Sequence, residues 1–442
     1  MLNAVQSHLQ RVAAAAVDGQ WPSIVEVATG RQPLDDQAPR RVYRLIGAPR
    51  GSTLYWDQPL LVAAARLAVL TGQAEWQALA DDYIRAFLER CVAGSGMFRW
   101  GNHCYYGTAE HRVVEFHGGV HELRPITPAW DLFWRVDPAR TARYIRAMGE
   151  RHVYDPATGG FNRHDDAKPG HAFIEAGGIL CESLAWLAGK TGDAPLLELA
   201  LRVARYSFRH RHPATGLVPN EPDHGRWDSR VCTSEIGVWA QSLLRAASAT
   251  GNDEFQTMAA EALRAYLRYA FDPATGRAWG QLDLATGQAV IPAQEGYWPG
   301  RHADPWSTAQ WPTHDYPMTV AEAALTLFHQ TGEVFFRDGA ERLARQAVAS
   351  APAHTGLPAY AESDGRVIHL LARLGRELGS ADARADAARL AGEALARLYR
   401  NGMFQGMDGL GRHEAVDGSG YLQLALLLLE TGEEPSLLGF GF

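Results

Sequence analysis

Residues 306–350 read WSTAQWPTHDYPMTVAEAALTLFHQTGEVFFRDGAERLARQAVAS, and this stretch contains one complete copy of the pattern that organises the chain. A loop rich in Trp leads into an apolar helix, a Thr-Gly turn ends that helix, and a more polar helix follows. Pro317 suits the first turn of the apolar helix, because the N–H that proline lacks has no partner there. Residues 314–316, His-Asp-Tyr, therefore precede a helix N-terminus, where unpaired N–H groups and the helix dipole favour an anion.

The same unit of loop, apolar helix, tight turn and polar helix recurs along the chain. Glycine is a frequent helix C-cap, and a polar or acidic residue after it starts the next helix, which explains the turns. They lie at Thr71-Gly72, Thr191-Gly192, Thr250-Gly251, Thr331-Gly332 and Thr431-Gly432. We expect apolar helices near residues 56–70, 119–135, 172–190, 233–250, 317–331, 366–379 and 418–431. Their polar partners are expected near 74–91, 138–152, 194–210, 253–270, 334–350 and 382–399, with an N-terminal helix near 3–16.

This repetition predicts an all-α fold, an α/α toroid or barrel of about seven helical hairpins, with apolar helices inside and polar helices outside. The (α/α)7 arrangement is favoured over (α/α)6. An open solenoid is the structural rival, although its units are usually shorter and more uniform. No Pro- or Ser-rich linker divides the chain, so residues 1–442 are expected to form one catalytic domain.

Composition excludes several classes of function. The chain has 442 residues, 46% of them hydrophobic, and a net charge of −8 without a basic run, so we expect no nucleic-acid partner. No apolar segment is long enough to span a bilayer, so no membrane partner is expected. The four cysteines are far apart and are expected to be free thiols. The N-terminus lacks the features of a signal peptide, so we expect a cytoplasmic protein, or a periplasmic or secreted one if a signal was removed. The oligomeric state is left open.

Four long loops carry most of the 17 histidines together with Arg, Tyr and Trp. Loops held by a rigid scaffold carry function more often than helices do, and in a toroid all of them would meet at one end. The loops span residues 98–124, 155–175, 220–235 and 279–316. Aromatic rings interleaved with hydrogen-bonding groups are typical of a sugar-binding cleft, although the tryptophans Trp227, Trp298, Trp306 and Trp311 could equally be core.

Metal and nucleophile chemistry are weakly indicated. His117 and His121 have a four-residue spacing that would share a helix face, but Gly118 and Gly119 oppose a helix there, so no catalytic metal and no other cofactor is expected. There is no GxSxG motif, and one Cys beside one His does not make a catalytic pair.

Two enzymatic readings remain. The first is β-elimination on a uronic-acid polymer, which needs cations to neutralise the uronate and a base and an acid beside it. A locally cationic cleft in an acidic protein suits such an anionic substrate. The second is an inverting glycoside hydrolase, which needs two carboxyl groups roughly 6.5–9.5 Å apart. The candidates for those carboxyl groups are Asp165, Glu175, Asp228, Glu235, Glu295 and Asp315.

Together with the hairpin repeat, three motifs resemble polysaccharide lyases with an α/α toroid, closest to the alginate and glucuronan lyase family 38. They are FNRHDD at 161–166, NEPDHGRWDSR at 220–230 and WPTHDYP at 311–317. The resemblance implies metal-independent β-elimination with a Tyr acid, a His base or neutraliser, and Asn, His or Arg on the carboxylate. The catalytic candidates that it implies are Tyr316, Tyr297, His224, His314 and Asn220. The substrate-binding candidates are Asn162, Arg163, His164, His171, Arg230, His117, Arg112, His103, Trp227, Trp298, Trp306, Trp311 and Glu235.

The sequence thus predicts a lyase that acts on an anionic polysaccharide or oligosaccharide such as alginate or glucuronan. Related toroids include sugar epimerases and unsaturated-uronyl hydrolases, so an epimerase and a hydrolase remain as alternatives. The non-enzymatic alternative is a carbohydrate-binding toroid, which would need aromatic and amide groups in its cleft but no titratable pairs.

Overall fold

The helical hairpins predicted around the Thr-Gly turns are present in the computed structural model. After α3 (Leu54–Thr71), Gly72 has a φ of 69°, a left-handed conformation that glycine adopts without a steric penalty. The Thr71 hydroxyl donates to the Leu67 carbonyl at 2.7 Å and accepts the Gln73 N–H at 3.3 Å, so one side chain satisfies both sides of the turn. Left-handed glycines cap four further apolar helices, at Gly192, Gly251, Gly332 and Gly432.

The structure describes residues 1–33, 50–101, 103–115, 117–222, 227–291, 300–307, 314–351 and 359–433, with only the main chain of residue 117. These residues fall into two units, which are treated separately. The first unit comprises the described residues of Met1–Glu122, Pro128–Ala147 and Gly356–Phe440. The second comprises those of Leu123–Thr127 and Met148–Thr355.

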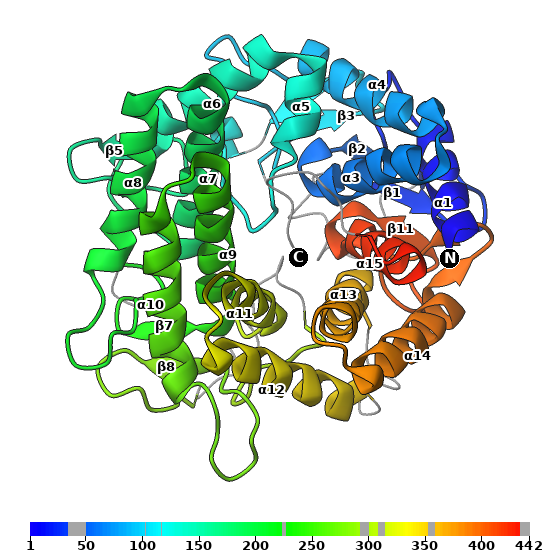
Figure 1. Ribbon diagram of the computed structural model, residues 1–442. Coiled ribbons are helices and arrows are strands. Elements are labelled where there is room, and N and C mark those ends of the chain that lie inside the picture. Colours follow the sequence, from blue (N-terminus) through cyan, green and yellow to red (C-terminus); the bar gives the residue numbers. More distant parts are fainter. Residues whose placement is uncertain are drawn as a thin grey trace. The chain divides into compact units, whose positions relative to one another are not determined.

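In the first unit three apolar helices pack on one another, and polar helices lie against them (Figure 1). The apolar helices are α3, α13 (Ala361–Glu377) and α15 (Ser419–Thr431), and α15 contacts both of the others. The remaining helices are α1 (Leu2–Ala14), α4 (Ala74–Arg90), α5 (Trp130–Val136), residues 138–147 of α6 (Pro138–His152) and α14 (Ala381–Leu398). Apart from α5, the predicted helices and polar partners therefore coincide with the observed ones to within a few residues.

Short antiparallel strands order the loops of the first unit. One pair joins β1 (Ile24–Glu26) to β11 (Arg412–Glu414), with Ile24 opposite Glu414. The other strands are β2 (Gly51–Ser52), β3 (Cys104–Gly107) and β4 (Arg112–Glu115) in one sheet, and β9 (Tyr399–Arg400) with β10 (Met403–Phe404) in another. Two 3₁₀ turns, η1 (His117–Gly119) and η3 (Ala415–Asp417), complete the unit.

In the second unit the apolar helices α7 (Ile174–Thr191), α9 (Thr233–Thr250) and α11 (Met318–Thr331) pack in that order. Their polar partners are α8 (Ala194–Arg209), α10 (Asp253–Tyr269) and α12 (Val334–Ser350). Two strand pairs lie in the connecting loops, β5 (Val153–Asp155) with β6 (Gly160–Phe161), and β7 (Arg230–Cys232) with β8 (Gln281–Asp283).

Glycine allows these apolar helices to approach closely. A Cβ atom built on Gly189 would lie 2.2 Å from the carbonyl oxygen of Ala249, and one on Gly237 would lie 2.2 Å from the Thr319 hydroxyl. Neither space holds a larger residue, so these positions fix the separation of α7 from α9 and of α9 from α11.

One predicted helix is wrong over much of its length. The sequence predicts an apolar helix at 119–135, but α5 begins only at Trp130. Pro125 and Pro128 lie in the missing part, and a proline disfavours the helical conformation of the residue before it and removes an N–H donor. The loop into α5 is consequently longer than predicted.

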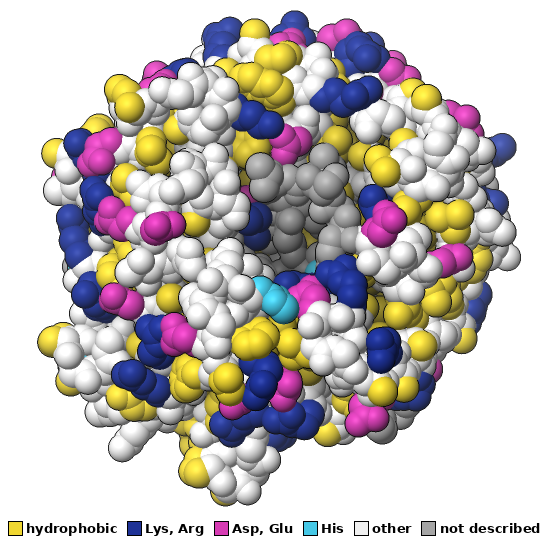
Figure 2. Space-filling model, in the orientation of Figure 1, with side chains coloured by type: hydrophobic (Ala, Val, Ile, Leu, Met, Phe, Trp, Pro, Cys, Tyr) yellow, Lys and Arg dark blue, Asp and Glu magenta, His cyan; other side chains and the backbone are white. Residues whose placement is uncertain are grey.

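The described surface carries mixed charge. On the face drawn in Figure 2, basic and acidic side chains are interspersed. The polar helices carry ion pairs along and between them, such as Arg205 with Glu254 at 2.6 Å. In the described part of the chain, no helix is long and apolar enough to cross a membrane.

A buried carboxyl group makes the stability of the protein depend on pH. Asp57 in the first turn of α3 is fully buried and accepts a hydrogen bond from the Tyr83 hydroxyl at 2.9 Å. Burial raises the pKa of Asp57 from 3.8 to about 8. Between these values the folded chain binds a proton that the unfolded chain has lost, so the free energy of unfolding falls as pH rises, by at most about 1.4 kcal/mol per pH unit.

We expect Asp57→Asn to flatten this decline between pH 5 and 8, because asparagine is neutral in both states. Urea denaturation of the wild type and the variant across that range measures the slope. Asp382→Asn, at an exposed carboxylate in the first turn of α14, is the matched control and should leave the slope unchanged. Equal slopes for the wild type and Asp57→Asn would contradict a protonated Asp57.

Candidate functional site

His314 lies immediately before α11, as predicted, and is held in a left-handed conformation with a φ of 60°. Its Nδ1 hydrogen-bonds the Glu235 carboxylate, and its ring lies against Trp227, with the ring centroids 4.8 Å apart. The ring is also parallel to Phe173 within 9°, at 6.3 Å. An imidazole that is oriented by a carboxylate and enclosed by two aromatic rings is suited to proton transfer.

Two glutamates begin the neighbouring helices of this unit. Glu175 is in the first turn of α7 and Glu235 in the first turn of α9, and both are almost fully buried. Burial, and then the negative charge of Glu235, raise the pKa of Glu175 to about 8, against the opposing charges of Arg163 and Arg124. Glu175 therefore holds a proton at neutral pH, whereas Glu235 bonds an imidazole nitrogen.

Arg163 supplies a positive charge in the loop that leads into α7. Its guanidinium lies 4.8 Å from the centroid of the Phe173 ring, and its side chain is half-buried. The main chain on both sides is held, because the Arg163 N–H donates to the His171 carbonyl at 3.0 Å and the Leu123 N–H donates to the Arg163 carbonyl at 2.9 Å. A guanidinium in this position can bind a carboxylate with two parallel hydrogen bonds.

Asn162, predicted to bind substrate, has its amide engaged in the local turn. Its Nδ2 donates to Asp166 Oδ1 and to the Lys168 carbonyl, each at 3.0 Å, and its Oδ1 accepts the His164 N–H at 2.9 Å. These bonds shape the loop that presents Arg163. Asn162 thus has a structural role, because it holds the loop in the conformation that places Arg163.

His171 and Asn220 line the next part of the loop region. His171 is exposed, and its Nδ1 lies 3.6 Å from a carboxylate oxygen of the fully buried Glu221. Asn220 is also fully buried, and its main chain bonds Ile174 and Arg230. Neither side-chain amide atom of Asn220 has a hydrogen-bond partner among the described residues. A buried amide of this kind is costly unless a ligand or solvent satisfies it, which supports its candidacy for binding.

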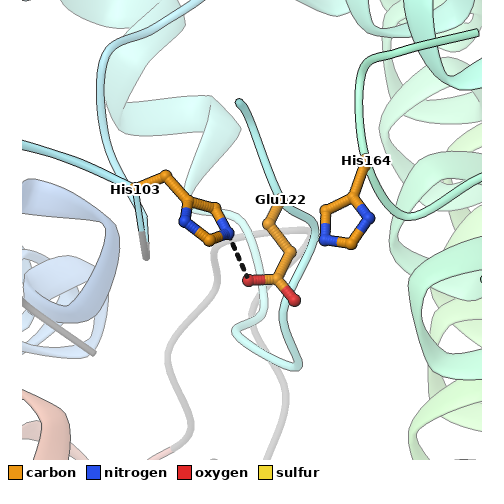
Figure 3. Close-up of side chains that lie close together, drawn as sticks. All are labelled: His103, Glu122 and His164. Atoms are coloured by element: carbon orange, nitrogen blue, oxygen red, sulfur yellow. Dashed lines mark ion pairs between the residues drawn. The ribbon is translucent and has the colours of Figure 1, made fainter. Parts of the chain in front are cut away.

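A histidine and a carboxylate are paired in the first unit. His103 Nε2 lies 3.6 Å from Glu122 Oε2, and Glu122 is almost fully buried (Figure 3). The histidine that the sequence had considered for a metal, His121, has a different role, since its Nε2 accepts a hydrogen bond from Trp100 at 2.9 Å and lies 2.6 Å from the Tyr144 hydroxyl.

Within the first unit, His103 and Glu122 therefore offer an imidazole and a buried carboxylate side by side. Imidazole and carboxylate together suit a divalent cation. Spacing could not have revealed this pair, since its members are 19 residues apart.

The remaining predicted residues are dispersed or buried. Arg112 is exposed on β4, and Arg230 on β7 donates to the Gln281 side chain at 3.2 Å. Trp306 donates to the Ala347 carbonyl at 3.2 Å and is a core residue. Tyr316 is fully buried. Tyr297, His224, Trp298, Trp311, Glu295 and the side chain of His117 lie outside the described residues, so their roles stay predictions.

Comparison with known proteins gives a partial match. Residues 52–175 match the family described as periplasmic pectate lyase. A pectate disaccharide-lyase of Dickeya dadantii (strain 3937) is 26% identical over 34% of this chain, and the match spans 33% of that protein. The chain therefore covers about a third of the length of this curated relative. The more specific resemblance to alginate and glucuronan lyases stays a prediction.

Solved structures are similar over nearly the whole chain. An unsaturated glucuronyl hydrolase from Bacillus sp. GL1 matches with a TM-score of 0.51 and 13% identity, covering 98% of this chain and 95% of that one. A cellobiose 2-epimerase from Bacillus thermoamylovorans B4167 matches with a TM-score of 0.52 and 8% identity, covering 96% and 97%. An α-1,6-mannanase variant of Salegentibacter sp. HEL1_6 matches with a TM-score of 0.50 and 13% identity, covering 97% and 99%. This likeness confirms the α/α toroid fold class, and the number of hairpins stays a prediction.

The proton on Glu175 can be observed directly. In the Asp57→Asn background, which removes the other carboxyl group whose pKa burial raises to about 8, infrared difference spectroscopy should show a protonated carboxyl band that titrates near pH 8 and is lost on adding Glu175→Gln. Glu235→Gln should move the midpoint to lower pH, because it removes the negative charge that opposes ionisation of Glu175. Glu75→Gln, at an exposed glutamate in the first turn of α4, is the control. A band that survives in Glu175→Gln would assign the proton to another group.

Proposed function

We propose that the protein is a lyase that cleaves a uronic-acid polysaccharide of the pectate type by β-elimination. One observation carries the proposal: the segment similar to periplasmic pectate lyase, residues 52–175, contains Arg163 and Glu175 of the second unit and the His103–Glu122 pair of the first. Four of the candidate site residues thus fall inside the matched segment, whereas His314 and Glu235 lie outside it.

The reaction needs a cation beside the uronate carboxylate. Neutralising that carboxylate lowers the pKa of the neighbouring C5–H, which otherwise resists removal. Arg163 suits this role, because Phe173 supports its guanidinium and its main chain is bonded on both sides. Asn220 can add amide hydrogen bonds to the same substrate group, since its side chain has no partner among the described residues.

Proton transfer then needs a base and an acid. His314 is the proposed base: with Nδ1 donating to Glu235, Nε2 is the nitrogen that accepts the C5 proton. The electron pair of the C–H bond forms the C4–C5 double bond while the C4–O bond breaks. Glu175, protonated at neutral pH, is the proposed donor to the leaving oxygen. Tyr297 remains the alternative acid from the sequence.

A divalent cation is part of the proposal. His103 and Glu122 of the first unit would supply protein ligands to it, since an imidazole and a buried carboxylate suit such an ion. When bound, such an ion adds positive charge beside a substrate carboxylate. This differs from the metal-independent reaction that the sequence suggested, an expectation that rested on the resemblance to alginate and glucuronan lyases and on the His117–His121 spacing.

A glycoside hydrolase is the second candidate. The pair Glu175 and Glu235 favours it, because two buried carboxyl groups begin neighbouring helices and burial raises the pKa of Glu175 to about 8, as a general acid requires. Two of the similar structures are hydrolases by name. The carbohydrate-binding alternative predicts binding without any product.

Product analysis separates these functions. We expect incubation with polygalacturonate to raise absorbance near 235 nm, the band of the unsaturated product, with alginate and glucuronan tested alongside. A rise in reducing ends on neutral or uronic glycans without that absorbance would replace the lyase by a hydrolase. Binding without either signal would leave a carbohydrate-binding protein.

Arg163→Ala should lower the rate of elimination by about a hundredfold or more, the scale for removing a group that stabilises developing charge. Arg163→Lys should recover part of this rate, since it restores charge but not the bidentate geometry. Arg202→Ala, on the exposed face of α8, removes the same charge and should have no effect. Steady-state absorbance assays measure all three, and full activity in Arg163→Ala would exclude the proposed role.

Metal binding has a test that does not depend on activity. After chelator treatment, adding Mn²⁺, Ca²⁺ or Mg²⁺ should raise the melting temperature of the wild type, because a ligand of the folded state stabilises it. Glu122→Gln should lose this rise, whereas Glu115→Gln, at an exposed glutamate on β4, should keep it. The metal proposal fails if no cation shifts the wild-type melting temperature.

A further inference from the structure

The second unit contains a groove of about 910 Å³ that none of the roles above uses. It is formed by the turn after α10, residues 300–305 and the last turns of α12. Its charged lining is mainly arginine, contributed by Arg277, Arg301, Arg342 and Arg345. A groove lined by four guanidinium groups from three separate segments is a candidate site for an anion.

The walls of the groove are held together by hydrogen bonds. The Gln346 side chain accepts the Ala278 N–H at 2.8 Å and donates to the Ala303 carbonyl at 2.7 Å, so it joins α12 to both loops. His302 Nε2 lies 3.0 Å from Asp272 Oδ2, which joins the two loops to each other. The arginines therefore extend from segments that hydrogen bonds hold together.

Two aspartates of these segments form hydrogen bonds within the groove wall. Asp272 bonds His302, and that bond, followed by local main-chain and Thr275 bonds, lowers the pKa of Asp272 to about 2. Asp315 accepts the Gly300 N–H at 3.0 Å. Asp272 and Asp315 hold the loops, and Asp304 and Asp315 also line the groove, where four arginines outnumber two carboxylates.

Elsewhere on the second unit, two arginines of the polar helices illustrate the ion-paired case. Arg205 pairs with Glu254 at 2.6 Å, and Arg264 pairs with Glu333 at 2.7 Å. In the groove Arg345 contacts Glu341 at 3.5 Å, but no described carboxylate is within ion-pair distance of Arg277, Arg301 or Arg342.

Aromatic rings hold two of these arginines in place. The guanidinium of Arg301 lies 5.6 Å from the centroid of Trp279, and that of Arg342 lies 3.6 Å from the centroid of Phe271. Packing on a ring restrains a guanidinium while leaving its N–H donors available.

The groove adjoins the candidate catalytic residue His314. Asp315 lines it, and the preceding residue, His314, bonds Glu235. A polymer bound at His314 would therefore have an arginine-lined path beyond the site of cleavage. We propose that this groove is a second binding site, which takes carboxylate-bearing sugar units of an acidic polysaccharide through Arg277, Arg301 and Arg342.

The site rests on the proposed function for its polymeric ligand, so its test measures binding and not turnover. Affinity electrophoresis in gels containing polygalacturonate compares the wild type with Arg301→Ala/Arg342→Ala. Arg202→Ala/Arg205→Ala, on α8, removes two charges from ion-paired arginines of the same unit and is the matched control. Carboxyl-reduced polygalacturonate, a neutral polymer, tests whether charge is recognised.

We expect the dissociation constant for polygalacturonate to rise about tenfold or more in the groove variant, the scale for losing two charge-assisted contacts, and to change little in the control. The neutral polymer should retard none of the proteins. Equal retardation of the wild type and the groove variant, equal weakening by the control, or no retardation of the wild type would each overturn the site.

Turnover measured in parallel separates the two proposals. Weakened binding by the groove variant with no absorbance change near 235 nm in the wild type would keep the groove and remove the lyase. Elimination by the wild type with unchanged binding by the groove variant would keep the lyase and remove the groove.

Discussion

Two carboxyl groups held out of water, Glu175 and Glu235, are the constraint on which the chemistry of the second unit depends. Both begin apolar helices, and their like charges oppose simultaneous ionisation. Glu235 bonds His314, so the negative charge is placed there, and Glu175 keeps its proton. Position alone thus divides two identical side chains into a proton donor and the partner of a base.

The framework around these groups uses the same residue types as the site itself. Asn162 shapes the loop that presents Arg163, His121 makes buried polar contacts with Trp100 and Tyr144, and the His302–Asp272 pair joins two loops. Each is polar and lies in a long loop, yet its hydrogen bonds go to the protein. Function is therefore indicated by a polar group whose partners are incomplete, such as the amide of Asn220, more than by residue type.

The hairpins could be predicted because their signals are local. A Thr-Gly turn encodes a helix C-cap and the start of the next helix within four residues, and apolar periodicity gives the helix between two turns. The exception is α5, where Pro128 prevents the helix that periodicity alone suggested. The placement of His314 and Arg163 in loops that lead into apolar helices was also predictable.

By itself, the sequence determined the helical class, the order of apolar and polar helices and the loops that carry polar side chains, because each depends on residues close together in the chain. Tertiary structure decided that Glu235 bonds His314, which is 79 residues away, and that His103 pairs with Glu122. It also decided which of many similar side chains are buried, and burial sets the pKa of Glu175. Distances and desolvation arise only when remote segments pack together, so no local pattern could encode them.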